Sequence, residues 1–501
     1  MNAIGVSPQV LLITVIVYFA LLYVVSYFTS RNADTDTFFR ANNKSPWILV
    51  AIGMIGASLS GVTFISIPGV VGAGGANQAF SWMQMVLGFL VGYAVIALIL
   101  MPIYYRMNLT SIYGYLENRF GFWSYKFGAF YFILSRIIGA SFRLYLVAMV
   151  LHPFVLGPLG ISFELTIFFT LLLIWIYTFK GGIKTIVWTD TIQTITMLLA
   201  VCFTIYFICD SMGVSIGSMM ERVESSGLSQ VFFFENGWSD PNNFYKQFIS
   251  GALIAIVMTG LDQDMMQKNL TCKTLGDAQK NILVFSIILI FANLLFISLG
   301  AILYIYAGDL GIMIPDSTDQ LFPLIALQHL PPMIGVVFII GLIAAAYSSA
   351  DSALTALTTS FCVDFLDFEK KDLSEKEKKK KRLIVHVGFT VILFLVIFIF
   401  NRLNNDAVIN GLFKAAGYTY GPLLGLYTYG ILTKLKTWDK LVPLVVIASP
   451  IITFVIDYNS ADWFGGFTFG FFVLALNGLL TFLGLLTLNF VMPNSTRVLT
   501  Q

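Results

Sequence analysis

The chain has 501 residues, of which 57% are apolar and 11% charged, and its mean hydropathy is +0.83. Soluble globular proteins carry about 25% charged residues, so this composition excludes an ordinary soluble protein and places most of the chain in lipid. The net charge of only +2, without a basic domain, also excludes a nucleic-acid-binding protein.

Long apolar stretches occur along the whole chain, and a helix needs about 20 apolar residues to cross the hydrocarbon core of a membrane. Thirteen stretches meet this requirement, and nothing between them is large enough to form a second domain. The sequence therefore predicts an all-α membrane protein with one domain over residues 1–501. Its spans are expected at about 8–29, 46–74, 79–105, 123–151, 159–179, 187–211, 244–267, 281–307, 332–363, 383–400, 407–432, 440–457 and 466–491.

Basic residues gather in alternate loops between these spans, and cytoplasmic loops are the ones that collect Lys and Arg. Most of the 29 basic residues fall on the inside if the N-terminus lies outside, and the opposite loops are acidic or neutral. We therefore expect a plasma (inner) membrane protein with its N-terminus outside and its C-terminus in the cytoplasm. The Lys-rich stretch at 368–382 is interpreted as a solvated inside loop rather than an anionic-lipid patch, because acidic residues dilute its charge.

The second span has glycines, serines and a proline in its middle, in the segment GASLSGVTFISIPG at 56–69. These residues weaken a helix, and an interrupted backbone is tolerated in a membrane only where it lines a cavity or is buried in protein. Carbonyls released by such a break can bind a cation, while a helix N-terminus there can face an anion. The alternative is a kinked helix with a packing stripe of small residues.

The seventh span has a milder break around Thr259 and Gly260. Two interrupted spans that lie five spans apart are expected at the centre of a five-plus-five inverted repeat. The sequence therefore predicts two structural halves, at about 46–211 and 244–432.

Ionisable side chains within spans are costly and are functional candidates by default. Apart from those in the ninth span they are few, namely Arg136 and Arg143 in the fourth, Asp190 near the inner end of the sixth, and Lys414 in the eleventh. For Lys414 the sequence suggests only interhelical pairing or snorkelling. The charged group at the inner end of the seventh span is interpreted as helix-end caps: Asp262, Asp264 and Lys268.

The ninth span carries Ser348, Asp351, Ser352 and Thr355 at spacings of three and four residues, which places them on one helical face. Hard cations prefer several oxygen ligands, at least one of them anionic when the site is deep. We interpret this face as an ion-binding surface. The alternative is that small and hydroxyl-bearing residues merely allow close helix packing.

Four segments resemble the sodium:solute symporter family: GASLSGVTFISIPG at 56–69, GGIKTIVWTDTIQT at 181–194, GLDQDMMQKNLTCKTLGDAQK at 260–280 and AAAYSSADSALTAL at 344–357. The resemblance covers essentially the whole chain and is strongest for the branch that transports sialic acid, monocarboxylates and proline. It implies the leucine-transporter fold, with one extra helix before the inverted repeat and two after it. It also implies sodium (Na+) as the coupling ion.

The resemblance implies two places for sodium. The first would use the main-chain carbonyls of Gly56, Leu59 and Ala345 with the hydroxyls of Ser348 and Ser349. A second, present in some members, would use Asp190, Asp351 and Ser352, together with the Ser348 hydroxyl. Those members carry a hydroxyl residue where this chain has Asp351. The two carboxylates would either strengthen a second sodium site, or one would be protonated and make the group proton-linked or purely structural.

For the solute, the resemblance implies hydroxyls from the second span, a glutamine from the third span and an arginine from the fourth. A guanidinium can hold a carboxylate through two hydrogen bonds, although snorkelling or an internal ion pair is the alternative for either arginine. The candidate residues are Ser58, Ser60, Thr63, Gln84, Arg136 and Arg143. The sugar ligands of a galactose transporter are replaced here by apolar residues, which disfavours a galactose-type pocket: Val62, Ala255 and Leu289.

The implied function is sodium-coupled import of a small polar solute, carboxylate-bearing like sialic acid, a monocarboxylate or an amino acid, by alternating access. The alternatives are a sodium-coupled sugar or polyol symporter and a sensor that binds solute without transport. An enzyme is not expected, because the sequence shows no cluster of nucleophile, base or metal ligands. The expected partners are the solute, sodium and membrane lipid, and the expected functional unit is a monomer.

Overall fold

The computed structural model describes residues 6–30, 35–179, 182–235, 237–403 and 408–491. All regular structure in these residues is helical, apart from one isolated bridge between Ser45 and Cys272. The expected all-α class is therefore confirmed.

Nine helical segments of the described residues are long and apolar enough to cross a membrane. Their main helices are α1 (Pro8–Thr29), α5 (Trp82–Val95), α8 (Phe122–Leu151), α10 (Ile183–Ser211), α14 (Leu275–Leu310), α16 (Pro332–Ser360), α17 (Glu375–Leu403), α19 (Val442–Tyr458) and α21 (Val473–Val491).

Two further spans are broken, and both breaks lie where the sequence predicts them. The first joins α3 (Trp47–Ser58) to α4 (Gly61–Val70) with a bend of 52°. The second joins α12 (Phe244–Ala255), continued by one wide turn to Gly260, to α13 (Gln263–Asn269) with a bend of 68°. Counting each bent pair once gives up to eleven crossings among the described residues.

Two more predicted spans are helical as well. The shorter apolar helix α9 (Phe163–Thr178) occupies the fifth predicted stretch, and α18 (Val408–Leu432) occupies the eleventh. The count of thirteen crossings remains a prediction. The loop at 212–243 contains the short helix α11 (Ile216–Ser225), and other short helices include α2 (Thr35–Arg40), α7 (Gly114–Arg119), α15 (Leu321–Leu324) and α20 (Ser460–Trp463).

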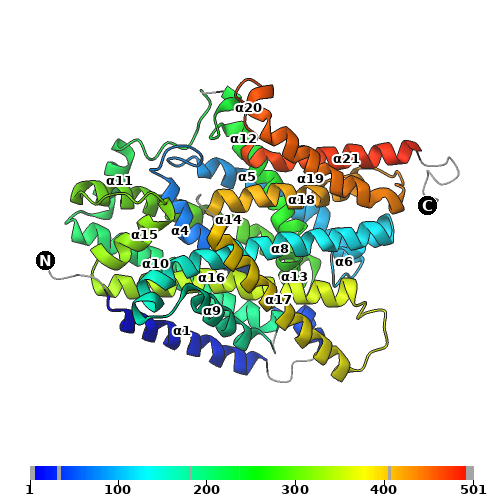
Figure 1. Cartoon of the computed structure of the whole chain (residues 1–501), viewed down its shortest axis with the longest axis horizontal. Coiled ribbons are helices and arrows are strands. Elements are labelled where there is room, and N and C mark those ends of the chain that lie inside the picture. The colour runs from blue at the N-terminus through cyan, green and yellow to red at the C-terminus, as the bar shows by residue number, and fades with distance from the viewer. Residues whose placement is uncertain (1–5, 31–34, 180–181, 236, 404–407, 492–501) are drawn as a thin grey trace.

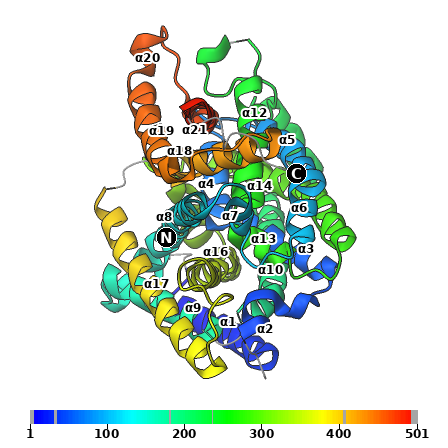
Figure 2. The same cartoon turned by 90° about the vertical axis from the view of Figure 1, so that its right-hand side faces the viewer.

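Most long helices run along the long axis of the molecule (Figure 1). A view turned by 90° shows α16 near the middle, with α1 and α17 towards one edge and α19 and α20 at the other (Figure 2). The broken pair α3–α4 packs against α10, α14 and α16. Its break is therefore enclosed by protein on several sides, which is the condition under which a membrane tolerates one.

The outer helices present apolar side chains outward. Val17 on α1 and Ile384 on α17 are 63% and 62% exposed, whereas the whole stretch of α16 from Gly341 to Ser360 is buried. Apolar residues outside and polar residues inside are typical of a protein whose solvent is lipid.

Candidate functional site

The break between α3 and α4 releases main-chain carbonyls near the centre of the molecule. The hydrogen-bond ladder of α3 ends where the Leu59 amide donates to the Ile55 carbonyl. The ladder of α4 begins where the Phe64 amide donates to the Ser60 carbonyl. Between them, Leu59 and Ser60 have non-helical ψ angles of 70° and −179°. The carbonyls of residues 56–59 thus fall between the two ladders, as the sequence predicts for a cation site.

Two serines of α16 lie against this break. Ser349 Oγ donates to the Ala57 carbonyl at 3.3 Å. Ser348 Oγ is fully buried, as is Ala345 one turn earlier, and it has no hydrogen-bond partner among the described residues. An added Cβ on Gly56 would lie 3.3 Å from Ser348 Oγ, so glycine leaves room beside that hydroxyl. Buried hydroxyls almost always have a partner, and the orphaned Ser348 hydroxyl therefore fits a sodium ligand.

The three residues expected at a second ion site do meet in the structure. Ser352 contacts both carboxylates: its hydroxyl donates to Asp190 Oδ2 at 3.3 Å, and its amide donates to Asp351 Oδ1 at 2.5 Å. The Tyr177 hydroxyl donates to Asp351 Oδ2 at 2.8 Å. The structure adds a fifth member, because Lys268 Nζ lies 2.6 Å from Asp190 Oδ2. Both carboxylates and the ammonium group are buried.

The expectation for the end of the seventh span is partly wrong. Asp262 does cap α13, since its side chain accepts hydrogen bonds from the amides of Asp264 and Met265. Lys268 is instead a buried partner of Asp190. Every residue of α13 is buried, so its side chains meet neighbouring helices rather than water.

The two arginines of α8 differ in their partners. Arg136 forms an ion pair with Asp264 and lies 3.8 Å from Asp262, which also accepts a hydrogen bond from Tyr420. Arg143 is also buried, but its Nε and Nη1 atoms have no hydrogen-bond partner among the described residues. Arg136 Nε and Nη2 also lack a hydrogen-bond acceptor among those residues, so the two arginines differ in their ion pairs: Arg136 has carboxylate partners, and Arg143 has no ion pair within the described part of the chain.

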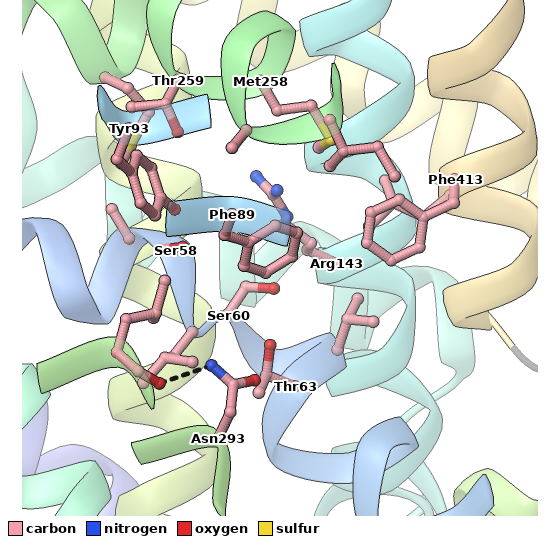
Figure 3. Close-up of a pocket in the computed structure, with 18 of the residues that line it drawn as sticks. Ser58, Ser60, Thr63, Phe89, Tyr93, Arg143, Met258, Thr259, Asn293 and Phe413 are labelled. Carbon is pink, nitrogen blue, oxygen red and sulfur yellow. Dashed lines mark hydrogen bonds between the residues drawn. The ribbon is translucent and has the colours of Figure 1, made fainter. Parts of the chain in front are cut away.

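A cavity of about 80 Å³ lies between the two breaks. Figure 3 shows the Arg143 guanidinium pointing into it, with Ser60 and Thr63 of the α3–α4 segment on one side. Ser58 and Arg136 line it too. Five of the six predicted solute residues thus line one cavity.

Gln84 is the exception. Its amide nitrogen donates to the Asn242 carbonyl at 2.8 Å, and its amide oxygen accepts from the Phe233 amide at 3.1 Å. It does not appear among the described residues that line the cavity. In this structure Gln84 holds the loop before α12 against α5.

Sequence reasoning missed several residues of the cavity wall. Asn293 of α14 accepts a hydrogen bond from Trp82 Nε1 at 2.8 Å and lines the cavity, as does Thr259. The sequence does contain features that could have identified both residues: Asn293 is an amide in the middle of an apolar span, and Thr259 lies at the second break. Phe89 and Phe413 gave no such signal, because phenylalanines in spans are usually packing residues.

Lys414 has an environment that the sequence did not predict. It is exposed and lines a second cavity of about 420 Å³ with Lys246 and Asp457. Its neighbour Phe413 lines the central cavity and lies 5.0 Å, centroid to centroid, from Phe471 of the second cavity. Lys414 thus faces open space close to the central site.

Comparison with known proteins places this geometry in a family. The model of the sodium:solute symporter family matches residues 38–435. The chain is 25% identical over 475 residues to the sodium/sialic acid symporter NanT of Aliivibrio fischeri, covering 92% of this chain and 90% of that one. It is 26% identical over 424 residues to the sodium/sialic acid symporter SiaT of Proteus mirabilis, covering 83% of each.

A sodium-coupled monocarboxylate transporter 2 of Danio rerio is 27% identical over 444 residues, covering 83% of this chain and 67% of that protein. Among solved structures, a substrate-bound, outward-open sodium-coupled sialic acid symporter superposes with a TM-score of 0.81 at 22% identity, covering 96% of this chain and 98% of that one. The chain belongs to the sodium:solute symporter family.

Proposed function

We propose that this protein is a sodium-coupled symporter that imports a small carboxylate-bearing solute. The observation that carries the solute class is Arg143, a buried guanidinium aimed into the central cavity with donors that no described residue accepts. Arg136 has Asp262 and Asp264 as counter-ions, whereas Arg143 has no ion pair of its own among the described residues. A buried charge without a partner is costly, and a solute carboxylate would supply two acceptors in the geometry that a guanidinium prefers.

The surroundings of Arg143 support an anionic ligand. Ser60 and Thr63 place hydroxyls in the same cavity, and α4 starts at Gly61 with its N-terminus at the break. A helix N-terminus carries a partial positive charge that favours anions. The chain is similar to transporters of sialic acid and of monocarboxylates, and these two solutes bear a carboxylate. This similarity also supports an anionic solute.

Sodium would bind between the released carbonyls at 56–59 and the α16 hydroxyls. These groups come from a broken span and from a packed helix, so the ion would hold the two together in the solute-binding conformation. A sodium ion falling through 100 mV releases about 2.3 kcal/mol, and a tenfold concentration ratio adds about 1.4 kcal/mol. Their sum supports roughly 500-fold accumulation of a neutral solute per ion. A monoanionic solute would lose about 2.3 kcal/mol of that sum to the voltage.

The cavity must widen during transport. A water molecule needs roughly 10–15 Å³ of cavity volume, whereas pockets for drug-sized ligands measure roughly 300–1,000 Å³. The present 80 Å³ therefore holds several waters but not a sugar acid. Movement of α18, which carries Phe413, would open the cavity towards the larger space that Lys414 lines.

The proposal includes thirteen spans, with an inverted repeat at 46–211 and 244–432, in the plasma (inner) membrane with lipid around a monomer. The N-terminus would lie outside and the C-terminus in the cytoplasm. Figure 1 supports this topology, because α1 begins and α21 ends at opposite ends of the helix bundle. A chain that crosses the membrane an odd number of times has its two ends on opposite sides.

The test is solute selectivity in an Arg143 series. Purified protein in liposomes with an inward sodium gradient should accumulate a small carboxylate, Arg143→Lys should reduce this uptake, and Arg143→Gln should abolish it. Arg222→Gln is the matched control, because Arg222 pairs with Asp309 at the surface. Uptake of carboxylates by Arg143→Gln at the normal rate, or uptake of neutral sugars alone, would contradict the proposed solute class.

A further inference from the structure

The second cavity, which Lys414 lines, is large enough for a whole solute. Its volume of about 420 Å³ falls within the range of roughly 300–1,000 Å³ for ligand pockets, whereas the central cavity measures about 80 Å³. Its walls come from α12, from α18, from the end of α19 and from the segment 468–472. The proposed topology puts the loops at this end outside, and Tyr458 of the wall is 79% exposed. We therefore place the opening of this cavity on the outer side.

The charged groups of the second cavity favour an anion. Two ammonium groups, those of Lys246 and Lys414, line it together with one carboxylate, that of Asp457. This carboxylate already accepts a hydrogen bond from the Tyr418 hydroxyl at 2.6 Å. Asp240, whose charge also acts on Lys246, is not among the described residues that line the cavity. The charged side chains of the wall therefore carry one net positive charge.

Lys246 is the buried member of this group. It is 4% exposed, and its Nζ donates to the carbonyls of Trp238 at 3.0 Å and Thr468 at 2.8 Å. The same atom lies 4.8 Å from the centre of the Phe467 ring. These partners are all neutral, and the ammonium group forms no ion pair with a described residue. A buried charge that has only neutral partners is costly, and an anion in the second cavity would lower that cost.

An aromatic pair separates the second cavity from the central one. Phe413 lines the central cavity, Phe471 lines the second, and their ring centroids lie 5.0 Å apart. Lys414 directly follows Phe413 on α18, so a carboxylate held by its ammonium group would lie close to this pair. Phe469 and Phe472 add apolar wall that can contact the carbon skeleton of a solute.

We propose that the second cavity is a reception site for small carboxylates, in which Lys246 and Lys414 hold the solute before the rings of Phe413 and Phe471 separate. This inference rests on the proposed carboxylate solute. The reception site binds weakly, because Lys414 is exposed and an exposed ion pair contributes little. Its positive charge raises the concentration of anionic solute next to the central cavity.

Equilibrium binding to purified full-length protein tests the reception site, with radiolabelled sialic acid and lactate as probes. Arg143→Gln removes the guanidinium of the central cavity, and the binding that remains in this variant is assigned to the second cavity. Adding Lys414→Gln should weaken this remaining binding about two- to fivefold, the effect of one exposed ion pair. Lys434→Gln is the matched control, because Lys434 is exposed after α18 and is not among the described residues of the cavity wall. N-acetylmannosamine, a neutral sugar, should not bind.

Asp457→Asn separates an effect of charge from a structural one. Asparagine keeps an oxygen for the Tyr418 hydroxyl but removes the negative charge of the wall, so it should strengthen the remaining binding about two- to fivefold. The proposal is overturned if Arg143→Gln binds neither probe, if neither charge change alters the remaining binding, or if the neutral sugar binds equally well.

Failure of the proposed function has a different signature. Uptake by the native protein would then lack sodium dependence or selectivity for carboxylates, while binding to the Arg143→Gln protein would still respond in opposite directions to Lys414→Gln and Asp457→Asn.

Discussion

Replacing Ser348 by alanine separates a sodium ligand from an ordinary packing residue. The Ser348 hydroxyl is buried and meets no hydrogen-bond partner in the described segments, and an unsatisfied buried polar group costs about 1–3 kcal/mol. Its removal should therefore raise the free energy of unfolding in sodium-free buffer, by roughly 1 kcal/mol. The same change removes one oxygen ligand from the ion, and we take the loss of this ion–dipole contact as comparable to that of a hydrogen bond to a charged group, about 1.5–3 kcal/mol. Sodium binding should weaken by about 10- to 150-fold.

Ser349→Ala is the matched comparison on the same helix. Its hydroxyl donates to the Ala57 carbonyl at 3.3 Å, so its loss should lower sodium-free stability by about 1 kcal/mol instead of raising it. The assay is thermal unfolding of detergent-purified protein over a range of sodium concentrations at constant ionic strength. Because a ligand that binds only the folded state stabilises it according to its affinity, the same experiment reports both quantities. If Ser348→Ala lowers sodium-free stability and leaves the half-saturating sodium concentration unchanged, Ser348 is a packing residue and the reasoning fails.

Three further changes test other contacts of the site. Gly56→Ala should raise the half-saturating sodium concentration and destabilise the fold by about 1–3 kcal/mol, because its Cβ would overlap a threonine hydroxyl of α10. Gly61→Ala is the control in the same thermal assay, because its Cβ meets nothing closer than 3.7 Å. Lys268→Ala should destabilise the protein by about 3–5 kcal/mol, because breaking a buried pair leaves one charge without a partner. Asp190→Asn should recover part of this loss in the double variant. Equal stability of the native and Lys268→Ala proteins would contradict this cost. Gln84→Leu should lower the free energy of unfolding by about 1–3 kcal/mol, because it leaves the Phe233 amide without its acceptor. Sodium titration of this variant should give the native affinity. A large loss of sodium affinity would place Gln84 at the ion site instead.

The parts of the fold that were predictable are those encoded locally. Apolar length located the long helices, and the glycines, serines and proline at 56–69 located the first break, which the backbone angles of Leu59 and Ser60 confirm. Helical spacing placed Ser348 and Asp351 on one face of α16. These features depend on residues close together in the sequence, so periodicity and composition are enough to find them.

The pairings between distant segments were not predictable in this way. The sequence predicts Lys268 at the end of a span, because composition does not reveal that α13 is buried and that its lysine ammonium group pairs with Asp190. Likewise, nothing local distinguishes Arg136, which is paired with Asp264, from Arg143, which forms no ion pair with any residue that the structure describes. These roles follow from the approach of helices far apart in the chain.

The most direct test of the central claim is accumulation of a radiolabelled small carboxylate by purified protein in sealed liposomes. With sodium outside and potassium inside, the internal carboxylate concentration should rise above the external one, and a sodium ionophore should abolish the excess. Equal uptake when potassium replaces external sodium, or no accumulation above the external concentration, would contradict sodium-coupled symport.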